Sequence, residues 1–213
     1  MFSFGKTVEF DREVSLRLAE DFRAKKKPKK AIAELEKVLK VNPADAGAHA
    51  KLGPLLVQLG ERLRAAESFR IAADDLDARG FKDKALSLWL QVAQTRITDL
   101  GAWQKVAQFH AARGRKADGV KVLLQAADLQ EGKAGRANAI ALLRDVLVLD
   151  ARHLDATLEL APLLAKSGEK AEARALLEDA ASWSAGKALQ RVRKAQFALS
   201  PGFGTLWRWL RRK

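Results

Sequence analysis

The sequence predicts an all-α fold, a single right-handed solenoid of about eleven helices followed by an amphipathic tail. Three observations lead to this prediction. Ala and Leu, which favour helices and have little preference for strands, dominate the hydrophobic residues. Small and large apolar residues return at a fixed interval along the chain, and Gly or Asn/Asp-containing turns divide the pattern into helix-sized pieces. We therefore expect a stack of helices without a sheet.

The sequence has a 54-residue repeat. Glycines with this spacing occur at Gly60, Gly114 and Gly168. Four further columns combine small residues with large apolar residues in the same register. They are Ala31, Ala85 and Ala139; Leu35, Trp89, Leu143 and Phe197; Phe69, Leu123 and Leu177; and Ala72, Ala126 and Ala180. Five columns in one register indicate units that share a common interior.

Within each unit, apolar residues recur at helical spacing in three segments. The predicted helices lie near residues 10–26, 28–41, 45–59, 62–79, 82–96, 99–113, 116–131, 135–150, 153–167, 170–184 and 187–199. Short turns between these segments leave no room for other regular structure.

The columns resemble the tetratricopeptide repeat (TPR), a helix-turn-helix unit in which small and large residues alternate at set places. The best match runs from residue 46 to residue 72 and consists of Ala46, His49, Leu52, Gly53, Leu56, Gly60, Ala65, Phe69 and Ala72. Similar runs begin near Trp103 and Leu160, and a first hairpin extends from Leu18 to Pro43. The resemblance covers roughly residues 10–199 and implies a right-handed α-solenoid.

One feature departs from the family, because this chain repeats by three helices and not by two. In a two-layer stack, a three-helix unit places equivalent helices of successive units in opposite layers. Only positions two repeat units apart should then share an environment. Pro54 and Pro162 have this spacing, and Gln108 stands midway between them. Both prolines are expected to bend their helices, since an interior proline removes a backbone hydrogen bond.

The resemblance also implies a groove that takes a polypeptide. In the family the corresponding first-helix columns line a concave surface. The residues of this chain in those columns are Ala50, Pro54, Val57, Leu158, Pro162 and Ala165. The alternative is that these apolar helices are covered on several sides by other helices. The Lys and Asn pairs with which some family members hold a peptide carboxylate are absent from these columns.

We expect two domains, residues 1–200 as the repeat domain and residues 201–213 as a basic aromatic tail. The apolar residues of the tail follow helical spacing and are flanked by cations. They are Phe203, Leu206, Trp207, Trp209 and Leu210, and the cations are Arg208, Arg211, Arg212 and Lys213. So much apolar surface should be covered. The tail caps the solenoid, docks on a partner protein, or lies on an anionic membrane surface.

A second basic segment is a predicted turn that contains Lys25, Lys26, Lys27, Lys29 and Lys30. It is either a solvated turn or, together with the cations of the tail, a site for polyanions. The net charge of +13 is concentrated at the two ends: residues 1–30 hold nine Lys/Arg and five Asp/Glu, and residues 181–213 hold eight Lys/Arg and no acid. This distribution disfavours a continuous nucleic-acid-binding surface.

No residue is a candidate for catalysis. The chain has no cysteine, and His49, His110 and His153 belong to different helices without a paired carboxylate or a second ligand. We expect no metal, no cofactor and no small-molecule substrate. No run of residues approaches a membrane span, which predicts a cytoplasmic protein. The sequence thus predicts a non-catalytic scaffold or adaptor that binds a partner protein; the alternative is a module that binds nucleic acid or an anionic membrane.

Overall fold

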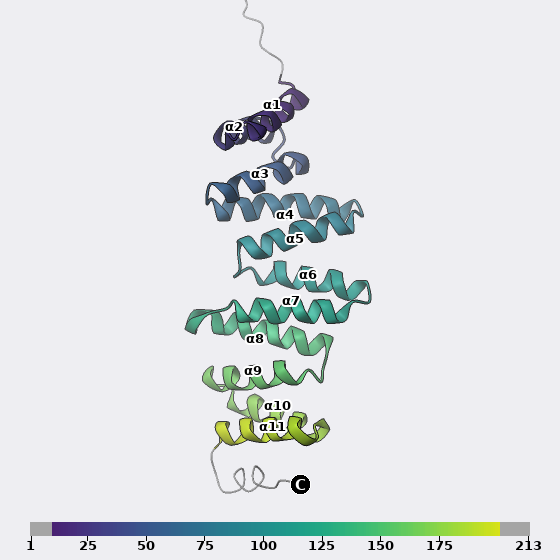
Figure 1. Cartoon of the computed structure of the whole chain (residues 1–213), viewed down its shortest axis with the longest axis vertical. Coiled ribbons are helices and arrows are strands. Elements are labelled where there is room, and N and C mark those ends of the chain that lie inside the picture. Colours follow the sequence, from purple (N-terminus) through teal and green to yellow (C-terminus); the bar gives the residue numbers. More distant parts are fainter. Residues whose placement is uncertain (1–9, 201–213) are drawn as a thin grey trace, which may run out of the picture. The chain divides into compact units, whose positions relative to one another are not determined.

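The computed structural model describes residues 10–200; residues 1–9 and 201–213 lie outside the described part. All regular structure of residues 10–200 is helical (Figure 1). The helices form two compact units, divided between Arg96 and Ile97. The predicted all-α fold is confirmed.

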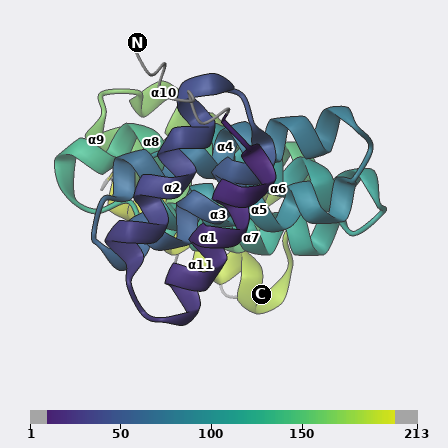
Figure 2. The same ribbon diagram turned by 90° about the horizontal axis from the view of Figure 1, so that it is seen from above.

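Each unit is a succession of helices in which every helix packs against the next (Figures 1 and 2). The first unit consists of α1 (Arg12–Ala24), α2 (Pro28–Val41), α3 (Ala46–Gln58), α4 (Arg62–Ala78) and α5 (Lys82–Thr95). The second consists of α6 (Leu100–Ala112), α7 (Lys116–Asp128), α8 (Gly132–Leu149), α9 (Leu154–Lys166), α10 (Lys170–Trp183) and α11 (Gly186–Leu199).

Most of the predicted helix boundaries agree closely with these bounds. The start of α8 differs from the prediction because the helix begins at Gly132, one turn before the predicted residue 135. The backbone N–H of Gly135 donates to the Glu131 carbonyl over 3.2 Å, and the Asn138 side chain donates to Gln130 over 3.1 Å. These bonds hold a first turn that hydrophobic periodicity alone does not reveal.

The 54-residue columns form the interior of both units. Ala72, Ala126 and Ala180 are at most 1% exposed, and Trp89 is 6% exposed. The other large members of the columns in helices α2 to α10 are as deeply buried. They are Leu35, Phe69, Leu123, Leu143 and Leu177. Burial of the same columns in successive units confirms the register.

The turn glycines also behave as one column. Gly60, Gly114 and Gly168 have φ angles of 79°, 73° and 96°, in the left-handed region. A side chain is strained there, whereas glycine adopts this conformation readily. The three glycines therefore end α3, α6 and α9 in the same way.

A capping column begins the same three helices. The side chains of Asp45, Asp99 and His153 accept the backbone N–H of the residue three positions later, over 2.8, 3.2 and 3.1 Å. These residues share the spacing of the turn glycines. An imidazole thus performs at α9 the N-capping function that a carboxylate performs at α3 and α6.

Positions two 54-residue repeats apart form corresponding ionic contacts. Arg64 of α4 lies 2.5 Å from Glu36 of α2, and Arg144 of α8 lies 2.9 Å from Glu172 of α10. Arg144 stands two 54-residue repeats after Glu36, and Glu172 stands two repeats after Arg64. The two pairs therefore occupy corresponding positions with the charges exchanged. The intermediate position 90 is a leucine, which cannot form an ion pair. The α2–α4 and α8–α10 segments thus share this ionic contact.

In the second unit, two helices also contact the helix after next: α6 contacts α8, and α9 contacts α11. The helices with interior prolines are continuous: α3 extends past Pro54 to Gln58, and α9 extends past Pro162 to Lys166. The prolines are exposed on their helix surfaces.

The ring of Phe69 in α4 packs directly against the backbone of α3 at Gly53. A Cβ atom at Gly53 would lie 2.4 Å from the Phe69 ring. Phe69 is 2% exposed and has little room to move. At the equivalent positions the chain has Ala107 with Leu123 and Ala161 with Leu177. Where the small residue is alanine instead of glycine, the large residue opposite it is leucine instead of phenylalanine.

This pairing predicts the effect of Gly53→Ala. We expect a loss of about 1–3 kcal/mol in unfolding free energy, because the added methyl group overpacks the interface with Phe69. The double variant Gly53→Ala/Phe69→Leu reproduces the native combination of the other two units and should recover most of the loss. Urea unfolding of the single and double variants measures both values. A Gly53→Ala variant more stable than the wild type, as helix propensity alone predicts, would contradict the assignment.

The capping column predicts the effect of changes at His153. His153→Ala should cost about 0.5–2 kcal/mol, since the N–H of Ala156 loses its acceptor. His153→Asp installs the residue found at positions 45 and 99 and should retain the cap. Thermal unfolding of both variants at neutral pH tests this, and equal losses from Ala and Asp would show that the histidine acts by packing instead.

Candidate functional site

The candidate site is an open cavity of about 660 Å³ in the second unit, between α9 and α11, with α10 beneath it. We call it the α9–α11 groove. Its lining residues are Leu158, Ala161, Pro162, Ala165, Lys166, Leu177, Arg191, Lys194, Ala195, Ala198 and Leu199. Eight of these eleven residues are apolar.

Helix α9 forms one wall of the groove, because several of its apolar residues are not buried in the core. Leu160 and Leu164 are buried and face the interior. Leu158, Pro162 and Ala165 lie elsewhere on the helix, where Pro162 is exposed and the other two are half-buried. A helix that is apolar nearly all round has to bury its second face against something, and here that face borders an open cavity.

Helix α11 forms the opposite wall with small side chains. Val192 is its one residue that is fully buried. Ala195 and Ala198 border the cavity, and their methyl groups are too short to fill it. The Gln196 side chain donates to the Leu177 carbonyl of α10 over 3.1 Å, which fixes α11 against α10. The space between α9 and α11 therefore stays open.

The polar residues of the groove are cationic. Lys166 comes from the end of α9, and Arg191 and Lys194 come from α11. Arg191 lies 2.6 Å from Asp155, and both side chains are more than half exposed. The groove thus combines an apolar floor with a positive rim.

A second cavity lies on the other side of the α9 ridge, against α8. It shares Leu158, Pro162 and Lys166 with the α9–α11 groove. Its charges are mixed: Asp128 and Glu159 are acidic, and Lys133 and Arg136 are basic, as is Lys166. Burial, followed by repulsion from Asp128 and Asp155, raises the pKa of Glu159. The cavity on this side of α9 therefore has acidic and basic side chains side by side.

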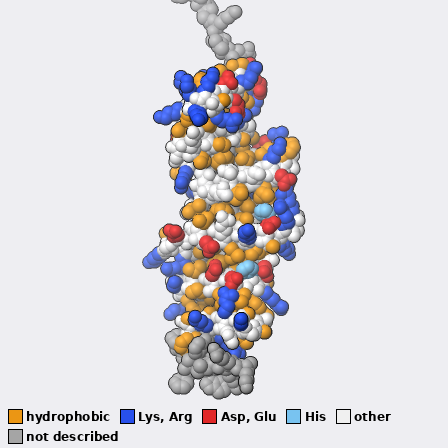
Figure 3. Space-filling view, viewed as in Figure 1, with side chains coloured by type: hydrophobic (Ala, Val, Ile, Leu, Met, Phe, Trp, Pro, Cys, Tyr) orange, Lys and Arg blue, Asp and Glu red, His pale blue; other side chains and the backbone are white. Residues whose placement is uncertain are grey.

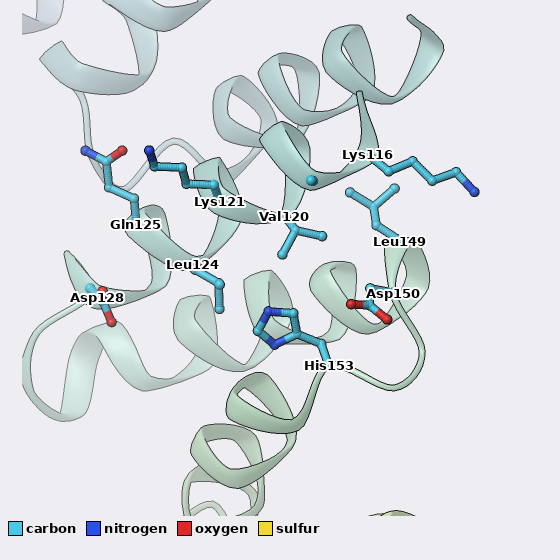
Figure 4. Close-up of a pocket in the computed structure, with 10 residues that line it drawn as sticks. Lys116, Val120, Lys121, Leu124, Gln125, Asp128, Leu149, Asp150 and His153 are labelled. Carbon is cyan, nitrogen blue, oxygen red and sulfur yellow. The ribbon is translucent and has the colours of Figure 1, made fainter. Parts of the chain in front are cut away.

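A third cavity lies along α7, facing the connection between α8 and α9 (Figure 4). Val120 and Leu124 of α7 point towards His153 and Leu149 across it (Figure 4). Because the Nδ1 atom of His153 accepts the N–H of Ala156, this histidine already has a structural function. Among residues 10–200, no group of three or more His, Asp or Glu side chains could hold a metal ion.

The structure brings together three of the predicted groove residues, Leu158, Pro162 and Ala165. Ala50, Pro54 and Val57 lie on α3 in the first unit, where Ala50 is half-buried and the other two are exposed (Figure 3 shows exposed apolar side chains on both units). Three of the six positions are thus exposed and three are half-buried. Whether any of the six contacts a partner stays a prediction.

The predicted polyanion site is exposed but has no further feature that favours it. Lys25, Lys26, Lys27, Lys29 and Lys30 are all exposed at the turn between α1 and α2. Lys30 lies 5.8 Å from the ring centroid of Phe22, a cation–π contact within its own hairpin. The tail residues Phe203, Leu206, Trp207, Arg208, Trp209, Leu210, Arg211, Arg212 and Lys213 lie outside the described residues.

Sequence reasoning missed the half of the groove that α11 supplies. Arg193 interrupts the alanine column, so α11 does not match the earlier units. The available signal was charge: between Gly186 and Leu199 the chain has four Lys/Arg and no Asp or Glu. Small residues at 195 and 198 beside these cations mark the wall of the groove.

Comparison with known proteins gives likeness of fold alone. No family model and no curated protein matches the chain. Similar solved structures include the MamA protein, with 16% identity and a TM-score of 0.32 over 80% of this chain and 90% of that one. TTC0263, a TPR protein of Thermus thermophilus, has 23% identity and a TM-score of 0.31 over 94% and 87%. YrrB, described as a TPR protein with an unusual peptide-binding site, has 14% identity and a TM-score of 0.32 over 92% and 90%.

These identities and TM-scores are too low to transfer a residue or a binding property. The TPR-like fold is assigned from the repeat columns, the positive-φ glycines and the paired helices of this chain. Each unit is a TPR-like helical stack. No helix within residues 10–200 has the length and apolar character that crossing a membrane requires.

Proposed function

We propose that this protein is a scaffold or adaptor that binds a segment of a partner polypeptide in the α9–α11 groove. The observation that carries the proposal is the unfilled apolar cavity between α9 and α11. Leu158, Pro162 and Ala165 leave apolar surface there, and Ala195 and Ala198 leave space above it.

Physical chemistry favours occupation of this groove. Apolar surface removed from water contributes roughly 25 cal/mol per Å². The walls are helices of 13 and 14 residues, about 20 Å long, which is long enough to receive several turns of a partner segment. Helix-lined grooves bind apolar side chains presented at regular spacing.

The groove also suits binding better than catalysis of a reaction within it. Within residues 10–200, its polar side chains are Lys166, Arg191 and Lys194, and no carboxylate, hydroxyl or imidazole lines it. A binding surface needs only shape, apolar area and a charged rim to fix orientation.

Filling the groove should abolish partner binding. Ala195→Trp places an indole in the cavity, and Ala198→Trp does so from an exposed position. Ala175→Trp, at an exposed position on α10 that does not line the groove, is the matched control. We expect the two groove variants to lose the same proteins from a pull-down that the wild type and the control retain, with unchanged melting temperatures.

Two results would contradict the proposal. One is retention of every captured protein by both groove variants. The other is loss from the Ala175→Trp control to the same extent, which would mean that an added tryptophan disturbs binding wherever it stands. Thermal unfolding of all three variants separates a blocked groove from a damaged fold.

A further inference from the structure

Among the described residues, the polar side chains that line the α9–α11 groove are all hydrogen-bond donors. Lys166, Arg191 and Lys194 carry N–H groups and no acceptor atoms. Arg191 has five N–H donors, so its contact with Asp155 leaves others for a second partner. An occupant of the groove must therefore supply acceptors, and carboxylates bind such donors most strongly.

The backbone of the groove offers an occupant few groups to pair with, the Leu158 carbonyl being one, since Pro162 has no N–H to donate to it. Its walls and floor are the helices α9, α10 and α11, whose backbone groups are bonded within each helix along most of their length. An extended segment would place most of its own N–H groups on an apolar floor with too few acceptors, which is costly. A helical segment satisfies its backbone internally. The groove consequently favours a helix over a strand.

The net charge at this place is positive. Helix α11 contains Lys187, Arg191, Arg193 and Lys194 and no acid, and Lys166 adds a fifth cation from α9. Asp155, in contact with Arg191, is the acidic neighbour. The cavity on the α8 side of α9 has mixed charges, with Asp128 and Glu159 beside its Lys and Arg side chains, whereas the charged residues that line the α9–α11 groove are all cations. Charge therefore directs an acidic segment to the α11 side.

The chain's own tail does not fit this description. Residues 201–213 follow closely after Leu199, which lines the groove, and so could reach it. However, the tail contains four Lys/Arg and no Asp or Glu. Its cations would lie beside those of α11, and it has no Asp or Glu side chain to pair with them.

Resting on the proposed function, we infer that the α9–α11 groove binds an acidic amphipathic helix of a partner protein. Its apolar stripe contacts Leu158, Pro162 and Ala165, and its flanking Asp and Glu side chains pair with Lys166, Arg191 and Lys194.

Synthetic peptides test the inference directly. The probe is a fluorescein-labelled peptide of about 18 residues, with Leu at i, i+3/i+4 and i+7 spacing and Glu at the flanking positions. Its twin has Lys in place of every Glu. Fluorescence anisotropy with the full chain should show the Glu peptide binding at least about tenfold more tightly than the Lys twin, and less tightly as salt rises. Equal affinities would overturn the inference.

Charge reversal locates the site. The variant Lys166→Glu/Arg191→Glu/Lys194→Glu should prefer the Lys twin. The control Lys25→Glu/Lys26→Glu/Lys27→Glu changes the net charge equally at the exposed α1–α2 turn and should keep the wild-type preference. The same loss in both variants would mean that net charge alone attracts the peptide, which would overturn the inference. Melting temperatures check that both variants are folded.

Two further results separate this inference from the proposed function. If neither peptide binds while Ala195→Trp still removes proteins from the pull-down, the groove binds a polypeptide of other chemistry and the acidic-helix inference is wrong. If a chain ending at residue 200 binds the Glu peptide more than about tenfold tighter than the full chain, the tail occupies the groove and the occupant is misassigned.

Discussion

The contact of the Phe69 ring with the backbone at Gly53 shows the constraint on which the fold depends. Two helices approach this closely only where one has no side chain beyond a hydrogen atom or a methyl group. The same small-large combination recurs at 107 with 123 and at 161 with 177. The α3–α4, α6–α7 and α9–α10 hairpins thus share one small-large packing arrangement, and the glycine turns and N-caps recur in the same register.

The groove is a consequence of this packing arrangement. Because the small-large columns supply the interior of each hairpin, the outward columns of α9 are not required for folding. Pro162 stands on that outward face, where an interior proline is tolerated because the helix is held by its other contacts. Where α11 follows with alanines at 195 and 198, the outward face is left partly open. Binding surface therefore arises from residues that the core does not use.

Much of the fold was predictable because its determinants are local or periodic. Alanine and leucine spacing revealed the helices, and the 54-residue columns identified the buried residues by their spacing alone. The capping function of His153 was not predicted, because a histidine at an N-cap is less common than Asp, and only the equivalence with Asp45 and Asp99 reveals it. The first turn of α8 was missed because side-chain bonds from Gln130 and Asn138 hold it.

The sequence predicted the α9 wall of the candidate groove but not the α11 wall. Leu158, Pro162 and Ala165 were accessible to sequence reasoning since they occupy repeat columns that the TPR resemblance associates with a groove. Their partners Lys194, Ala195 and Ala198 were not, because α11 departs from the columns at Arg193. Which face of a terminal helix meets its neighbour depends on tertiary packing, and the periodicity of one helix does not contain that information.

The chain has no cysteine, so a single introduced cysteine is the one thiol that can react. Its reaction rate therefore measures the accessibility of that position alone. Ala126→Cys and Ala180→Cys lie in buried columns, whereas Ala165→Cys, Ala195→Cys and Ala198→Cys line the groove. The rate of reaction with a maleimide under native conditions tests whether the columns pack and the groove is open. The account predicts fast reaction at 165, 195 and 198 and strong protection at 126 and 180. Protection at the three groove positions, or fast reaction at the two buried ones, would contradict it.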